Sequence, residues 1–220
     1  MELDTVLLDL DGTLTDPGLG ITNSIAHALR EAGMAVPPRE QLYRFIGPPL
    51  LEEFQAVYGL DEAGARRLLA AFRAYFEETG IWENRVYDGV PEMLARLREA
   101  GLRLVLATSK PEVFARRILE RFGLMPYFHT VAGSDGAETR ARKGQVVAYA
   151  LEQSGARRAL MVGDRRHDVD GARENGLPCL GVLYGYGSRE ELAAAGAAGL
   201  AETPAAAADW ILARLERERA

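Results

Sequence analysis

Short apolar runs alternate with stretches of helical spacing along this chain, and this alternation restricts its fold more than any other feature of the sequence. The composition of the runs is typical of β-strands, and they lie at residues 5–8, 102–107, 128–132, 159–163 and 178–183. Helical patterns lie between them at 91–101, 112–123 and 143–155. Strands joined by helices run parallel, and runs that are apolar throughout are buried on both faces. The sequence therefore predicts an α/β fold, a doubly wound parallel sheet with helices on both faces.

Residues 16–85 interrupt this alternation with helical patterns and no convincing strand. We interpret them as an inserted α-helical cap domain, and residues 1–15 and 86–220 as the α/β core domain. Gly18 and Gly20 at the start of the insert, and residues 84–91 at its end, are expected to form hinges. The alternative is that these helices pack rigidly on the sheet. The alanine-rich residues 193–208 are expected to form a helix, a loop and a second helix.

Charge, hydropathy and cysteine content restrict the partners and the cellular location that we expect. The net charge of −6 argues against a nucleic-acid partner, which usually requires a basic face. No apolar run is long enough to span a membrane, and no secretory leader is visible, so we expect a cytoplasmic protein with no membrane partner. The single cysteine, Cys179, lies in an apolar run and is expected to be a buried packing residue. A monomer and a homodimer both stay open.

Two carboxylates, Asp9 and Asp11, follow the first apolar run within the segment VLLDLDGT. Ligands of open α/β sheets bind beyond the carboxyl ends of strands, and residues two apart on extended backbone face the same side. Gly12 allows the chain to turn closely beneath a ligand. Two carboxylates this close repel each other, so we expect a cation to compensate them, and Mg²⁺ also binds phosphate oxygens. This arrangement favours phosphoryl transfer, with one carboxylate attacking phosphorus and the other moving a proton. The alternative is an Asp-Gly turn that caps a helix.

A second acidic loop follows the run at 159–163. Asp164 at that strand end is predicted to complete the cation site, and Asp168, four residues later, to hold it or to bond a water ligand. Alternatively, Asp168 only caps the amino end of the next helix. A third strand ends in Thr108 and Ser109, whose hydroxyls and backbone N–H groups at the start of the next helix suit phosphate oxygens.

The use of lysine adds an independent argument, because only Lys110 and Lys143 among the 26 basic residues are lysines. A chain so rich in arginine is expected to keep lysine where a compact charge is needed, as beside a phosphate and an attacking carboxylate. Lys143 is predicted to neutralise both the nucleophile and the transferring group, and Lys110 to contact the phosphate. The alternative is that both are ordinary surface lysines.

In order along the chain, these segments resemble the motifs of the haloacid dehalogenase superfamily, specifically its phosphatases with a helical cap inserted after the first motif. The motifs are DLDGT at 9–13, Thr108 in LATSK, Lys143 in RARKGQVV and GDRRHDVDGA at 163–172. The resemblance covers nearly the whole chain and implies a Rossmann-like core. Relatives often carry a Lys-Pro-x-Pro sequence where this chain has RARKGQVV.

The resemblance also implies a role for each matching residue. Asp9 is the expected nucleophile, and Asp11 is the acid/base, which also ligates Mg²⁺ through its backbone carbonyl. Asp164 is the expected metal ligand, and Asp168 is expected either to ligate the metal directly or only to support the site. The dehalogenase branch normally lacks the second aspartate, so Asp11 indicates phosphate esters. Thr108 and Lys143 are expected to contact the phosphoryl group. Apart from the resemblance, Ser109, Lys110, Gly12 and Thr13 are further candidates for phosphate binding.

Substrate choice is assigned to the cap, which closes over the leaving group. Its most distinctive segment, YRFIGPPL at 43–50, resembles a cap loop of phosphoglycolate phosphatase relatives and contains the expected specificity residues Arg44, Gly47 and Pro48. Arg44 suits a substrate carboxylate, although it also fits a solvated position. A small phosphate ester is the expected partner, with phosphoglycolate first. The alternatives are a 5′-nucleotidase, a pyrophosphatase and, more remotely, a sugar-phosphate mutase.

Two hypotheses come from another functional class. A signalling receiver domain also combines a phosphorylated aspartate, a hydroxyl residue, a lysine and Mg²⁺ on a doubly wound sheet. Receivers are shorter and lack such a helical insert, and their paired acids do not share a strand with the phosphorylated residue. A binding protein that keeps the fold without turnover is the second hypothesis.

Overall fold

In the computed structural model, which describes residues 2–135 and 140–219, the chain divides into two compact units. Unit 1 comprises residues 1–15 and 86–220, and unit 2 comprises residues 16–85. Two short strands, β2 (Thr15–Asp16) and β3 (Arg85–Val86), pair with each other where the chain passes between the units. No helix among the described residues is long and apolar enough to cross a membrane.

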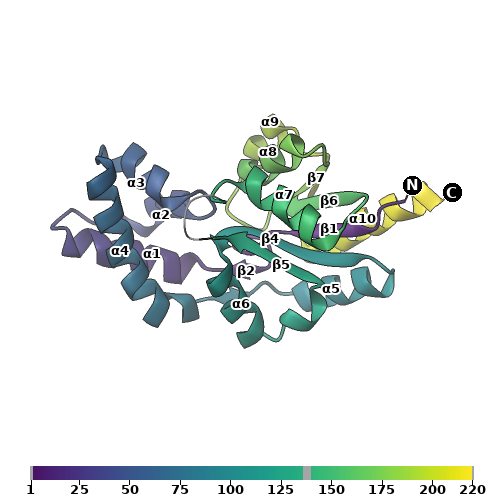
Figure 1. The fold of residues 1–220 in the computed structure, drawn as a ribbon, viewed down its shortest axis with the longest axis horizontal. Helices are drawn as coiled ribbons and strands as arrows, with labels where there is room; N and C mark the ends of the chain where they lie inside the picture. Colours follow the sequence, from purple (N-terminus) through teal and green to yellow (C-terminus); the bar gives the residue numbers. More distant parts are fainter. Residues whose placement is uncertain (1, 136–139, 220) are drawn as a thin grey trace. The chain divides into compact units, whose positions relative to one another are not determined.

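Unit 1 is built on a six-stranded sheet in the order β5-β4-β1-β6-β7-β8, and every pairing within it is parallel (Figure 1). Its strands are β1 (Thr5–Leu8), β4 (Arg103–Pro111), β5 (Thr130–Ser134), β6 (Ala159–Gly163), β7 (Cys179–Val182) and β8 (Gly199–Ala201). Its helices are α5 (Val90–Glu99), α6 (Glu112–Arg121), α7 (Lys143–Ser154), α8 (Arg166–Glu174), α9 (Arg189–Ala195) and α10 (Pro204–Arg219), with a 3₁₀ turn η3 (Met125–Tyr127). The predicted α/β class and doubly wound parallel sheet are confirmed.

Strand β1 lies between β4 and β6, and Leu7 is paired with Val105 on one side and Met161 on the other. From β1 the chain runs outward through β4 to β5, and then crosses back through α7 to β6. Right-handed crossovers that run in opposite directions place their helices on opposite faces of the sheet. The carboxyl end of β1 is therefore the point at which this fold binds ligands.

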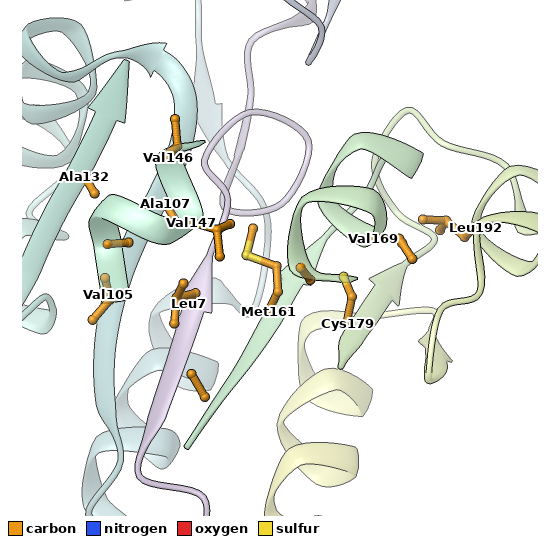
Figure 2. Packing of buried hydrophobic residues seen from close by; sticks show 13 residues of the cluster. Leu7, Val105, Ala107, Ala132, Val146, Val147, Met161, Val169, Cys179 and Leu192 are labelled. Atoms are coloured by element: carbon orange, nitrogen blue, oxygen red, sulfur yellow. The ribbon is translucent and has the colours of Figure 1, made fainter. Parts of the chain in front are cut away.

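Helices α7, α8 and α9 cover one face of the sheet over a continuous apolar cluster, part of which is shown in Figure 2. Leu7, Val105 and Met161 reach it from three neighbouring strands, and Val147 reaches it from α7. Cys179 belongs to this cluster and is buried with a free thiol, as expected from its apolar neighbours. This packing fixes the strand ends that carry the polar residues described below.

Two strands differ from the prediction. The apolar run of β4 stops at Ala107, but the strand continues to Pro111, because pairing with β5 resumes at Pro111 opposite Ser134 after a shift of register. Between α9 and α10, where a loop was expected, residues Gly199–Ala201 form the edge strand β8. This strand has only three residues and no β-branched side chain, so its sequence carries no strand signal.

Unit 2 consists of helices α1 (Gly18–Glu31), α2 (Arg39–Leu42), α3 (Leu50–Tyr58) and α4 (Glu62–Glu78), with 3₁₀ turns η1 (Tyr43–Phe45) and η2 (Gly80–Trp82). The prediction that Gly18 and Gly20 form an irregular hinge is wrong, because both lie in the first turn of α1. A Cβ atom at Gly20 would overlap the carbonyl oxygen of Gly80. Gly20 therefore allows close packing of α1 against η2 rather than flexibility.

Candidate active site

Three neighbouring strands of unit 1 bring polar side chains to their carboxyl ends. Asp9 directly follows β1, and its N–H continues the pairing by donating to Val162 O at 3.0 Å. Thr108 lies in the last part of β4, and Asp164 directly follows β6. All three side chains are buried, with 4% or less of each residue exposed. The strand order alone therefore gathers the three predicted motifs at one edge of the sheet.

A tight turn follows Asp9. The carbonyl oxygen of Leu10 accepts hydrogen bonds from the N–H groups of Leu14 and Thr15, and Gly12 N donates to Thr15 O at 2.8 Å. Gly12 has a φ of +83°, and a Cβ atom there would overlap the carboxylate of Asp164. The turn does not cap a helix, since α1 begins only at Gly18. The capping alternative for this motif is therefore wrong, and the turn instead brings its backbone against Asp164.

Asp9, Asp164 and Asp168 form a buried acidic cluster, in which one carboxylate oxygen of each residue lies within 4.8 Å of the other two. Lys143 enters it from the first position of α7. Its Nζ lies 2.7 Å from Asp9 Oδ1 and 2.8 Å from Asp168 Oδ1, and donates to Ala107 O at 3.0 Å. Only 4% of the Lys143 side chain is exposed, so the surface alternative for this residue is wrong.

The charges of this cluster do not balance among its members, because three carboxylates share one ammonium group. Burial, followed by repulsion from Asp168 and Asp9, raises the pKa of Asp164 well above its ordinary value. Burial also raises the pKa of Asp168 to about 6, although Lys143 opposes the shift. Burial alone would lower the pKa of Lys143, but Asp168 and Asp9 overcome it, and this pKa is raised. The cluster is therefore suited to one more positive charge.

Asp168 lies in the first turn of α8, where it has two partners. Its Oδ2 accepts a hydrogen bond from Arg165 N at 3.0 Å, while its Oδ1 faces Lys143. Arg165 is the N-cap residue of α8, and Asp168 at the third helical position completes a capping box with it. Asp168 thus helps to cap the helix, but its contact with Lys143 means that capping is not its only role. A Cβ atom at Gly163 would overlap the Asp168 carboxyl group, so the glycine that ends β6 makes room for this acid.

Asp11 lies apart from that cluster and pairs with the other lysine. Lys110 Nζ is 2.8 Å from Asp11 Oδ2, and 6% and 10% of the two side chains are exposed. Lys110 is therefore not a surface lysine either. Burial raises the pKa of Asp11, and the charge of Lys110 offsets only part of that effect. The two lysines thus serve different carboxylates.

The predicted phosphate-binding hydroxyls lie beside these acids. Thr108 Oγ1 accepts a hydrogen bond from Lys110 N at 3.2 Å, and Ser109 between them is half-buried. The expectation that they lie at the start of the next helix is wrong, because β4 continues through them and α6 begins at Glu112. Thr13 Oγ1 is fully buried and has no hydrogen-bond partner among the described residues.

The sequence analysis missed the loop Tyr184-Gly-Tyr-Gly187, which follows β7 and encloses Asp164. Tyr186 N donates to Asp164 Oδ2 at 2.8 Å. Gly185 and Gly187 pack so closely that a Cβ atom at either would overlap Asp164. The Tyr184 hydroxyl is buried, and burial followed by the charge of Asp164 raises its pKa. The sequence signal for this close approach of the loop backbone to Asp164 was the pair of glycines shortly after the apolar run at 178–183.

The predicted specificity residues lie together in unit 2. Arg44 is in η1, its Nε is 3.6 Å from Glu53 Oε2, and more than half of its side chain is exposed. Gly47 has a φ of +105° and is followed by Pro48, so this segment turns sharply between η1 and α3. Their role in substrate choice stays a prediction.

The acidic cluster has the features of a site for a divalent cation. Asp164 Oδ1 is buried and accepts no hydrogen bond from the described residues, although its other oxygen is bonded. A buried carboxylate oxygen normally has a partner, so this atom has an open coordination position. Oxygen ligands of this kind, with a net negative charge, suit a hard ion such as Mg²⁺. Asp9, Asp164 and Asp168 are therefore the residues that could hold it.

Comparison with known proteins agrees with this geometry. Residues 6–182 match the family model described as haloacid dehalogenase-like hydrolase. The chain belongs to this family. The hydrolase is 47% identical over 191 residues to a 5′-nucleotidase of Pseudomonas aeruginosa, with 86% of each chain covered. It is 32% identical over 196 residues to a phosphoglycolate phosphatase of Mesorhizobium japonicum, again with 86% of each covered.

Solved structures extend the comparison. A predicted phosphatase from Clostridium acetobutylicum matches the hydrolase with a TM-score of 0.94 and 41% identity, covering 97% of this chain and 100% of that one. Protein tyrosine kinase A of Mycobacterium tuberculosis matches with a TM-score of 0.83 and 39% identity, covering 96% and 98%. Taken together, the family and its close relatives identify the chain as a haloacid dehalogenase-like phosphatase, a phosphoric monoester hydrolase.

Proposed function

We propose that this phosphatase hydrolyses a small phosphomonoester in a Mg²⁺-dependent reaction that passes through an aspartyl-phosphate on Asp9. The observation that supports this best is the position of Asp9 at the end of β1, 2.7 Å from the buried ammonium of Lys143. A carboxylate there has a cation beside it and a second acid, Asp11, two residues away. Those are the groups that nucleophilic attack and proton transfer require.

The reaction has two steps that regenerate the enzyme. A carboxylate oxygen of Asp9 attacks phosphorus, the bond from phosphorus to the ester oxygen breaks, and Asp11 gives its proton to the departing oxygen. Water then attacks the phosphorus of the aspartyl-phosphate while Asp11 takes a proton from it. The bond from phosphorus to Asp9 breaks, and inorganic phosphate leaves with Asp9 again a carboxylate.

Other residues of the chain neutralise and orient the phosphoryl group. Lys143 already faces Asp9, so its charge lies beside oxygens that gain negative charge as the phosphoryl group transfers. The Thr108 hydroxyl, at the end of the neighbouring strand, is assigned to a phosphoryl oxygen. Asp9, Asp164 and Asp168 would hold Mg²⁺, with the Asp11 carbonyl expected to join them. When bound, Mg²⁺ supplies charge that reduces repulsion between phosphate and carboxylates.

The substrate is proposed from the relatives and from unit 2. A nucleoside 5′-monophosphate ranks first, because the relative named 5′-nucleotidase is 47% identical, and phosphoglycolate ranks second through a relative at 32%. This order reverses the one expected from the sequence. We assign unit 2 the role of the cap, with Arg44, Gly47 and Pro48 as its specificity segment. Arg44 suits a carboxylate or a second phosphate on the leaving group.

The first experiment measures phosphate release from adenosine 5′-monophosphate, phosphoglycolate, a sugar phosphate, pyrophosphate and an aryl phosphate, with Mg²⁺ and with chelator. We expect release that depends on Mg²⁺ and is lost in Asp9→Asn, which keeps the native circular dichroism spectrum. Asp209→Asn, an exposed acid on α10, is the matched control and keeps full activity. Activity in folded Asp9→Asn would overturn the nucleophile assignment, and phosphate appearing on an added acceptor would indicate a phosphotransferase such as a mutase.

A further inference from the structure

Lys110 forms a buried ion pair that the proposed reaction has not yet used. Its Nζ lies 2.8 Å from Asp11 Oδ2, and only 6% of its side chain is exposed. An ammonium group is rarely taken out of water this far without a partner, and here the partner is the proposed acid/base. The sequence analysis assigned Lys110 to the phosphate, whereas its neighbour in the structure is Asp11.

The local backbone explains how Lys110 reaches Asp11. Lys110 lies two residues after Thr108 in the part of β4 where the register with β5 shifts, and Lys110 N donates to the Thr108 hydroxyl. Strand β4 lies directly beside β1, which ends just before Asp9. On the far side, Gly133 of β5 packs against the backbone, because a Cβ atom there would lie 2.8 Å from Lys110 O and 2.6 Å from Glu112 Cα. The backbone that carries Lys110 is therefore packed closely on the side of β5.

The two lysines divide the carboxylates of the site between them. Lys143 contacts Asp9 and Asp168, whereas Lys110 contacts Asp11. Asp11 Oδ1 accepts no hydrogen bond from the described residues. If Lys110 turned away to bind phosphate, the Asp11 carboxylate would therefore lose the contact that orients it. The ion pair with Lys110 is thus the contact that holds this carboxylate on a defined side of the turn.

We propose that Lys110 is a positioning residue, which holds the Asp11 carboxylate where it exchanges a proton with the leaving-group oxygen and the attacking water. This inference rests on the proposed function, in which Asp11 is the acid/base. In the transfer of the phosphoryl group to Asp9, Lys110 is then important in proportion to how much the leaving group needs a proton, whereas the later hydrolysis step is the same for every ester. A phosphate-binding lysine would matter equally for every ester.

The test compares Lys110→Met, of similar length but uncharged, with wild type on two esters. One is whichever of adenosine 5′-monophosphate and phosphoglycolate the wild type hydrolyses, and the other is 2,4-dinitrophenyl phosphate, whose leaving group needs no proton. We expect kcat/KM to fall about 100-fold on the first ester and about threefold or less on the second, because this ratio reports transfer to Asp9 and not the hydrolysis of the aspartyl-phosphate that both esters share. Arg217→Met, an exposed position on α10, is the control and leaves both rates unchanged.

A double-mutant cycle makes the test independent of folding defects. Lys110→Met added to Asp11→Asn removes both charges, so no buried charge is left unpaired, and the double variant should be no slower than Asp11→Asn alone. Lys110→Arg should recover part of the lost rate on the first ester. Equal losses of kcat/KM on both esters, or additive losses in the cycle, would overturn the inference and assign Lys110 to phosphate.

The same data separate this inference from the proposed function. If wild type releases phosphate and Asp9→Asn does not, the phosphatase mechanism stands, and only the behaviour of Lys110→Met decides the inference. If Asp9→Asn stays active, or Asp11→Asn loses kcat/KM equally on both esters, the proposed roles of these acids fail and the positioning role of Lys110 fails with them.

Discussion

The ammonium group of Lys143 lies 2.7 Å from Asp9 Oδ1, and only 4% and 5% of the two side chains are exposed. Two further contacts fix it there: the ion pair with Asp168 and the hydrogen bond to Ala107 O. Behind its stem, a Cβ atom at Gly171 would lie 2.7 Å from Lys143 Cγ. One side chain of α7 thus joins the carboxyl ends of β1 and β4 to the first turn of α8, and little room remains for a larger group.

Lys143→Arg should lower kcat at least 100-fold, about 3 kcal/mol in transition-state free energy, although it keeps the charge. The planar guanidinium is wider than an ammonium group and cannot meet Asp9, Asp168 and Ala107 O from one point. Steady-state kinetics on the best ester of the panel provide the measurement. Arg217→Lys on the exposed face of α10 should be silent. A Lys143→Arg variant with near-normal kcat would show that only charge is needed.

Gly12→Ala should abolish phosphate release and weaken Mg²⁺ binding. The added Cβ atom would overlap the Asp164 carboxylate, and the φ of +83° adds backbone strain. Gly33→Ala is the matched control, since Gly33 has a φ of +67° and nothing within 4 Å of the added atom. That control should cost about 1 kcal/mol of stability and no activity. Mg²⁺ titrations followed by calorimetry compare the two variants, and equal Mg²⁺ affinities would contradict the prediction.

The sequence predicted the sheet and its polar strand ends well, because apolar runs such as 5–8 and 159–163 carry their own strand signal. Asp9, Thr108 and Asp164 follow or end such runs, so parallel strands were enough to bring them together. The bias toward arginine indicated Lys110 and Lys143 correctly as special positions, and both are buried in ion pairs.

What the sequence did not predict depends on tertiary contacts. The ion pair of Lys110 with Asp11 was not predicted, because nothing local shows that β4 continues past Ala107. The assignment of Lys110 to phosphate stays a prediction. The role of Tyr186 is carried by a backbone N–H, which every residue type has. Gly20 looked like a hinge because close packing and flexibility both favour glycine, and only the neighbouring helix distinguishes them.

Asp164→Asn should stabilise the metal-free protein while removing its response to Mg²⁺. Burial and two neighbouring acids raise the pKa of Asp164, so its charge is unfavourable without a cation, and asparagine keeps an oxygen for Tyr186 N. We expect a gain of about 1 kcal/mol, or 2–4 °C in Tm, and no further shift with Mg²⁺. Thermal unfolding with chelator and with Mg²⁺ measures both, beside Asp209→Asn. A lower Tm with chelator would mean that the carboxylate itself stabilises the fold.

The stabilisation of the wild type by Mg²⁺ should increase with pH between about 5 and 7.5. The pKa of Asp168 is about 6 in the folded protein, and that of Asp164 is also raised from its ordinary value of 3.8. The folded state therefore holds more protons than the unfolded chain in this window, so the metal-free free energy of unfolding falls as pH rises. Mg²⁺ competes with those protons, and its Tm shift should be small at pH 5 and full at pH 7.5. Thermal unfolding with Mg²⁺ and with chelator at both pH values tests this prediction. The Tm of Asp164→Asn should not change with Mg²⁺ at either pH. A Tm shift of the wild type that does not depend on pH would exclude these acids as the ligands.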